Sequence, residues 1–147
     1  MAIRILLVDD SDDFRAVVRE LLQQESDLEV VAEAADGDSA VEQARAFEPD
    51  VVTMALEMPA MGGIEATKQI VSSLSSTNIL ALSLYNDVSR IQSMIDAGAT
   101  GYVLKDDAYE ELIPAIRAVA AGENYFSASL PPPFGAGEDP EGSFDGQ

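Results

Sequence analysis

The sequence predicts a doubly wound α/β domain, in which a five-stranded parallel sheet carries helices on both faces. Short apolar runs of strand length recur between residues 3 and 104, and segments with helical periodicity separate them. Strands that alternate with helices are joined by right-handed crossovers, which give parallel pairing and cover both faces of the sheet. We expect the strand order 2-1-3-4-5 and ligand chemistry beyond the carboxyl ends of the strands.

The first part of the chain supplies three of the expected strands, at residues 3–8, 28–34 and 51–54. The first helix follows the first strand, and Ser11 or Asp12 can cap it. One face of this helix carries an i, i+3, i+4, i+7, i+8 stripe of Phe14, Val17, Val18, Leu21 and Leu22. Asp38 or Ser39 opens the second helix, which ends near residues 47–49.

The second part supplies the remaining two strands, at residues 79–83 and 101–104. A helix is expected at 64–74, after a loop rich in Met, Pro and Gly. The next helix begins at Asp87 or Ser89 and stops at Gly98, and the last runs over 109–121 and ends at Gly122.

We expect one domain over residues 1–125, followed by a linker or tail over 126–147. From Pro131 the composition changes to proline, glycine and acidic residues with no Lys or Arg. Such a segment offers little apolar surface to offset the entropy of ordering, so we expect it to be flexible from residue 131. It ends where a further domain would begin, which raises the question of a truncation at Gln147.

The composition excludes several classes of function. The formal charge of −19 argues against binding of nucleic acid or anionic lipid through a basic patch. The chain has no Cys, which excludes thiolate chemistry and fits a reducing cytoplasm, and no His, the commonest general base near neutral pH. No apolar run approaches the roughly 18 residues of a membrane span.

Polar residues follow several strands at the edge where a ligand is expected. Asp9 and Asp10 end the first strand, Ser83 ends the fourth and Lys105 follows the fifth, while Ala55 follows the third. Adjacent carboxylates form a hard-oxygen site of the kind that Mg²⁺ prefers. Lys105 would reach across the edge as a point charge for a carboxylate or phosphoryl oxygen.

Each of these residues also has a structural interpretation. The pair Asp9 and Asp10 can complement a helix N-terminus, and Lys105 can be a solvated lysine at a strand end. Ser83 can bond to a loop backbone, and Tyr102 can reflect ordinary β-propensity on a half-buried face.

Five blocks in order resemble the receiver domain of two-component response regulators, and the resemblance covers residues 3 to about 125. The blocks are Ile5–Asp10, Pro49–Pro59, Gly62–Glu65, Ala81–Ser83 and Gly98–Asp106. The ending Leu104-Lys105-Asp106, without a following proline, is similar to the NarL/FixJ (LuxR-type) subfamily, which carries a helix-turn-helix DNA-binding domain.

The resemblance implies that Asp9 and Asp10 hold Mg²⁺ together with the backbone carbonyl of Glu57. Lys105 would pair with the phosphoryl group, and Ser83 with Tyr102 would form the switch. A sensor histidine kinase would be the phosphodonor and a homodimer a product of activation. DNA would be reached only through a separate output domain. The chain is not expected to be an enzyme, although a native form with the family's phosphoacceptor aspartate would catalyse its own phosphoryl transfer and dephosphorylation.

The chain departs from the family at one decisive position, because the phosphoacceptor aspartate aligns with Ala55. A methyl group cannot accept phosphate, and its presence removes a metal ligand, so Mg²⁺ affinity should fall. We favour an Asp-to-Ala replacement, since every supporting part remains. A natural pseudo-receiver that acts through phosphorylation-independent contacts is the alternative. A Mg²⁺-dependent phosphatase with Asp9 as nucleophile is disfavoured, because Ser11 stands where that class has a second aspartate.

The missing acceptor also leads to an expectation about the switch. Without a phosphoryl oxygen, nothing draws Ser83 toward position 55. We therefore expect Tyr102 to have no space to turn into and to face outward.

Overall fold

The sheet follows the expected order and gains one short strand. The computed structural model describes residues 2–137, in which the strand order is β2-β1-β3-β4-β5-β6 with every pair parallel. The strands are β1 (Ile3–Val8), β2 (Leu28–Ala34), β3 (Val51–Met54), β4 (Asn78–Ser83), β5 (Gly101–Leu104) and β6 (Tyr125–Phe126). The predicted doubly wound sheet is confirmed. The sixth strand was not predicted, because two residues are too few to show a period.

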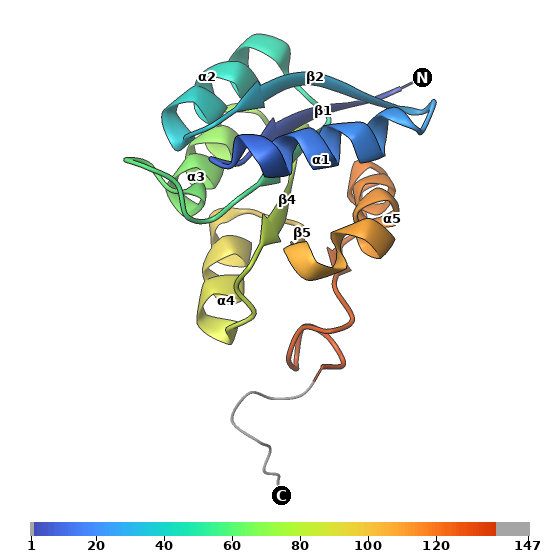
Figure 1. The fold of residues 1–147 in the computed structure, drawn as a ribbon. Coiled ribbons are helices and arrows are strands. Elements are labelled where there is room, and N and C mark those ends of the chain that lie inside the picture. The colour runs from blue at the N-terminus through green and yellow to red at the C-terminus, as the bar shows by residue number, and fades with distance from the viewer. Residues whose placement is uncertain (1, 138–147) are drawn as a thin grey trace, which may run out of the picture.

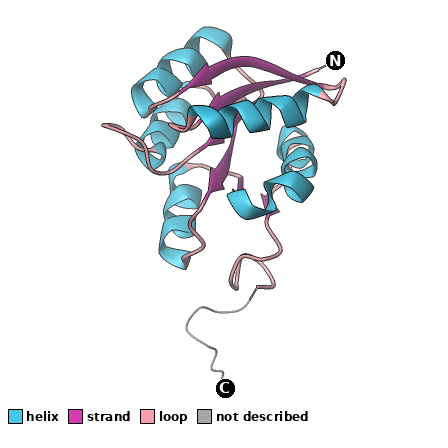
Figure 2. Ribbon diagram, viewed as in Figure 1, coloured by secondary structure: helices cyan, strands magenta, loops and turns pink. Residues whose placement is uncertain are grey.

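Helices cover both faces of the sheet (Figures 1 and 2). They are α1 (Asp12–Gln23), α2 (Gly37–Phe47), α3 (Gly63–Ser73), α4 (Val88–Ala97) and α5 (Ala108–Ala120), with a 3-10 turn, η1 (Lys105–Asp107), before α5. Each strand of the inner sheet points alternate side chains into two separate clusters. One cluster contains residues of α2, α3 and α4, and the other contains residues of α1 and α5.

Side-chain caps fix where three of the helices begin. Ser11 accepts a hydrogen bond from the Phe14 amide at 3.1 Å, and Asp87 accepts one from the Arg90 amide at 3.1 Å, so both expected caps are confirmed. The second helix starts earlier than expected because Asp36, rather than Asp38 or Ser39, caps it through the Ser39 amide.

Residues 131–137 contact the domain, although their composition offers little apolar surface. Leu130 is fully buried, and Phe134 packs against the apolar cluster that contains residues of α2, α3 and α4. The ring centroids of Phe134 and Phe126 are 6.0 Å apart. Backbone hydrogen bonds join Gly135 to Pro131 and Gly137 to Leu130. Two apolar side chains and a tight turn therefore compensate for the Pro- and Gly-rich composition. Residues 138–147 of the expected flexible tail lie outside the described residues.

Within residues 2–137, no helix combines the length and the apolar character that crossing a membrane would need.

Candidate functional site

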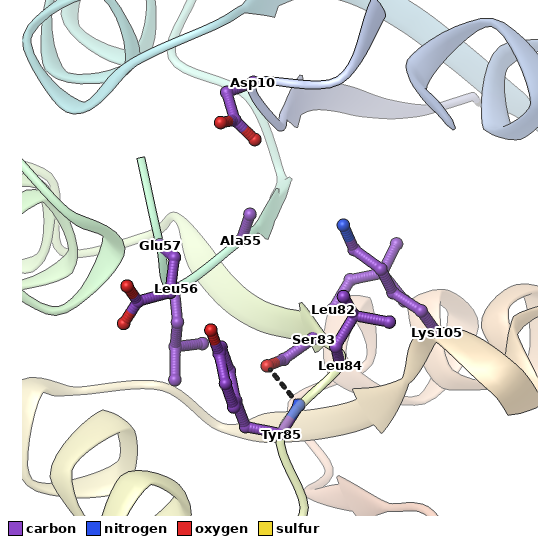
Figure 3. A pocket seen from close by; sticks show the side chains of 9 residues that line it. All are labelled: Asp10, Ala55, Leu56, Glu57, Leu82, Ser83, Leu84, Tyr85 and Lys105. Atoms are coloured by element: carbon purple, nitrogen blue, oxygen red, sulfur yellow. Dashed lines mark hydrogen bonds between the residues drawn. The ribbon is translucent and has the colours of Figure 1, made fainter. Parts of the chain in front are cut away.

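The carboxyl ends of β1, β3, β4 and β5 surround a cavity of about 170 Å³ (Figure 3). Its lining comprises Asp10, Ala55, Leu56, Glu57, Leu82, Ser83, Leu84, Tyr85 and Lys105. The parallel ladder brings these loops together, because the register of each pair ends at the same edge. Five of the residues singled out from the sequence therefore meet around one cavity, with Asp10 and Lys105 on different sides of Ala55.

Ala55 is held firmly at the centre of this arrangement. It is 4% exposed, and its amide donates to the Val8 carbonyl at 3.1 Å. On its other side α3 begins against the backbone, since a Cβ at Gly63 would overlap the Ala55 carbonyl oxygen. The position is thus built to present one side chain to the cavity, and that side chain is a methyl group.

Asp9 and Lys105 form the charged side of the site. Lys105 Nζ lies 2.6 Å from Asp9 Oδ2, and the two side chains are 16% and 5% exposed. Asp9 Oδ1 also accepts the Ser11 amide at 2.9 Å, and the Lys105 ammonium lies 4.4 Å from the centre of the Phe14 ring. Lys105 therefore reaches across the sheet edge to the Asp9 carboxylate. The Phe14 contact was not foreseen, because the helical stripe assigned that residue to the core alone.

Ser83 and Tyr102 form the neutral side of the site. Here the structure corrects the prediction that Tyr102 faces outward. Tyr102 does not face outward: it is fully buried, and its hydroxyl donates to the Tyr85 carbonyl at 2.7 Å. Ser83 Oγ accepts the Tyr85 amide at 3.0 Å. The loop backbone at Tyr85 thus satisfies both hydroxyls, so no phosphoryl oxygen is needed to bring Tyr102 inward.

Tyr85 is a site residue that the sequence reasoning missed. Its backbone contacts both switch candidates, and its ring lies 4.2 Å below the Arg90 guanidinium, which also pairs with Asp87. The only signal in the sequence is its place two residues after Ser83, within the loop that leads to α4.

Burial dominates the titration of the tyrosine. Removal from water raises the pKa of Tyr102 to about 12, although a hydrogen bond with Ser83 acts in the opposite direction. The hydroxyl is therefore a neutral donor at physiological pH, which suits its bond to the Tyr85 carbonyl.

The donor set fits a complete magnesium site poorly. Asp9 is already engaged by Lys105, Asp10 is exposed, and Ala55 supplies no oxygen. Among residues 2–137, no group of three or more acidic side chains is placed to hold a metal ion. What remains is two carboxylates and the backbone carbonyl of Glu57, a set that Mg²⁺ would have to complete with water.

Comparisons with known proteins agree with this geometry. Residues 5–117 match the family described as "Response regulator receiver domain". The transcriptional regulatory protein LiaR of Bacillus subtilis is 42% identical over 121 residues, which are 82% of this chain and 57% of that protein. DegU of Brevibacillus brevis is 37% identical over 123 residues, 84% of this chain and 52% of that protein. The chain thus spans between half and three fifths of the length of these curated relatives.

Two solved structures have the same fold. A two-component response regulator of the LuxR family from Aurantimonas sp. SI85-9A1 has a TM-score of 0.81 and 38% identity, covering 85% of this chain and 89% of that one. The signal receiver domain of the putative response regulator NarL from Mycobacterium tuberculosis has a TM-score of 0.78 and 31% identity. The match covers 83% of this chain and 98% of that one.

Proposed function

Because this chain belongs to the response regulator receiver domain family, close to its LuxR- and NarL-type members, we propose that it is a receiver which cannot be phosphorylated. One observation carries the proposal: the residue presented to the centre of the site is Ala55, while Asp9, Ser83 and Lys105 keep their places around it. An aspartate at position 55 would give a nucleophilic carboxylate beside the Lys105 ammonium.

The chain is then an Asp-to-Ala variant of a response regulator. A sensor histidine kinase would phosphorylate the form with aspartate at position 55, in the cytoplasm. In the family, phosphorylation changes the populations of two conformational states of the receiver. This change controls dimerisation or an output domain. The transcriptional output of relatives such as LiaR supports a DNA-binding partner domain outside this chain. Mg²⁺ would bind weakly here, at Asp9 and Asp10, because the third carboxylate is missing.

The test is phosphorylation of matched variants. After incubation with acetyl phosphate and Mg²⁺, the intact mass of the present chain should not change, whereas Ala55→Asp should gain about one phosphoryl group. Ala55→Asn, which has nearly the same shape without the nucleophile, is the control and should gain none. A stable adduct on the present chain at Asp9 or Asp10 would refute the proposal.

A second candidate is a natural pseudo-receiver that binds partners without phosphorylation. The buried Tyr102 favours it, because the neutral side of the site is already satisfied without a phosphoryl group. Sedimentation with and without beryllofluoride and Mg²⁺ separates the two. Association of Ala55→Asp only with the analogue supports the phosphorylation-dependent receiver, and strong association of the present chain regardless of the analogue supports the pseudo-receiver.

A further inference from the structure

The segment after α5, residues 125–137, begins as a strand paired with β5, the strand that precedes Lys105. Its first two residues form β6 beside β5, and the rest continues as a loop beyond the end of the sheet (Figure 1), where Ser127 bonds to β5 and Ser129 bonds to Asp107 of η1. We call residues 125–137 the C-terminal segment. Nothing in the proposed chemistry uses it, yet it contacts the two elements that carry Tyr102 and Lys105.

Ser127 attaches the segment to β5. It is fully buried; its amide donates to the Tyr102 carbonyl at 3.0 Å, and its hydroxyl accepts the Leu104 amide at 3.1 Å. The two bonds lie on either side of Val103, so they hold the stretch of β5 between the buried tyrosine and the strand end. Any residue except proline supplies the amide donor, but only a side chain with an acceptor, such as the Ser127 hydroxyl, also satisfies the Leu104 amide.

Two further contacts extend this attachment. The Ser129 hydroxyl bonds to the Asp107 carboxylate, which lies at the end of the turn that begins with Lys105. Leu130 is fully buried in the same apolar cluster as Tyr102. The segment therefore touches β5 by hydrogen bonds, the Lys105 turn by a polar contact and the tyrosine cluster by packing.

We propose that docking of the C-terminal segment holds Tyr102 and Lys105 in their site positions, so that the site and the docking of residues 125–137 are energetically coupled. Undocking removes the two Ser127 bonds to β5, which within residues 2–137 otherwise keeps only its ladder with β4, and the loop at Tyr85, whose carbonyl accepts the Tyr102 hydroxyl, loosens with it. Coupling of this kind is reciprocal, so any ligand that stabilises the site also stabilises docking. The proposal requires no phosphorylation and stands apart from the proposed function.

Hydrogen exchange of the full chain tests it. Ser127→Ala and Leu130→Ala should each speed exchange about tenfold within residues 127–137, because docking contacts are lost. The decisive readout is residues 84–87, which make none of the segment's hydrogen bonds. Their exchange should rise in parallel, while that of β1 and β2 stays at the parent rate.

Matched serine variants provide the controls. Ser72→Ala removes a hydroxyl that bonds only within α3, to the Gln69 carbonyl, and should leave both regions unchanged. Ser127→Thr keeps the acceptor and should restore most of the protection. Faster exchange in the segment with parent rates at residues 84–87 would overturn the coupling, as would unchanged rates in the segment for both Ser127→Ala and Leu130→Ala.

Discussion

The polar groups on both sides of the site around Ala55 have partners, but the interactions differ between the two sides. On one side Asp9 and Lys105, two nearly buried charges, satisfy each other at 2.6 Å. On the other side Ser83 and Tyr102, two buried neutral hydroxyls, are satisfied by the Tyr85 backbone. A buried charge that loses its partner is far more costly than a neutral hydroxyl that loses one hydrogen bond. The charged side is therefore the stability-sensitive part of the site, and the neutral side can rearrange at small cost.

Removing Lys105 tests the charged side and should have the largest effect. Lys105→Ala leaves the Asp9 carboxylate buried without its cation, so the free energy of unfolding should fall by about 3 kcal/mol. Urea denaturation at pH 7 measures this change in the free energy of unfolding. Lys68→Ala, at an exposed position of α3, is the control and should change stability by about 0.5 kcal/mol or less.

The double variant Asp9→Asn with Lys105→Ala should recover much of that loss, because the stranded charge is gone. A loss for Lys105→Ala no larger than that for Lys68→Ala would show that Asp9 is not dependent on its partner.

Restoring a carboxylate at position 55 tests whether Mg²⁺ stabilises the charged side of the site. Its effect on the free energy of unfolding should be intermediate. Ala55→Asp places a third carboxylate near Asp9 and Asp10, so without divalent cations stability should fall by about 1 kcal/mol through like-charge repulsion. Mg²⁺ should reverse that loss and raise the melting temperature of the variant well above its value in chelator. The present chain should respond much less, and an equal response of the two chains would contradict the weak-site expectation.

Removing the tyrosine hydroxyl tests the neutral side and should have the smallest effect at pH 7. Tyr102→Phe loses the bond to the Tyr85 carbonyl and should cost about 1 kcal/mol in urea denaturation. Tyr109→Phe, at a position that is 80% exposed, is the control and should be close to neutral.

Alkaline pH sharpens this last comparison. Burial raises the pKa of Tyr102 to about 12 in the fold, above its ordinary value of 10.0, so the folded chain favours the neutral form. That contribution is complete below pH 10 and is lost as pH rises toward 12. The parent should therefore lose its advantage over Tyr102→Phe between those values. A constant difference across that range would show that Tyr102 does not titrate as a buried group.

The sequence by itself determined the strand order, the helices and the set of side chains at the sheet edge. Strand ends in a parallel sheet meet at one edge whatever the packing details, so Asp10, Ala55, Ser83 and Lys105 could be brought together from their spacing. The identity of Ala55 and its chemical consequence needed no coordinates, since a methyl group has no lone pair to offer.

Only the tertiary structure decided how the site is satisfied. The inward position of Tyr102 depends on a carbonyl that the loop at Tyr85 presents, and β-propensity says nothing of that backbone. The docking of the C-terminal segment depends on Leu130 and Phe134 packing against a cluster that contains residues of distant helices, which composition cannot reveal. Local patterns follow from the period of the backbone, whereas the partners of buried polar groups are set by contacts between segments far apart in the chain.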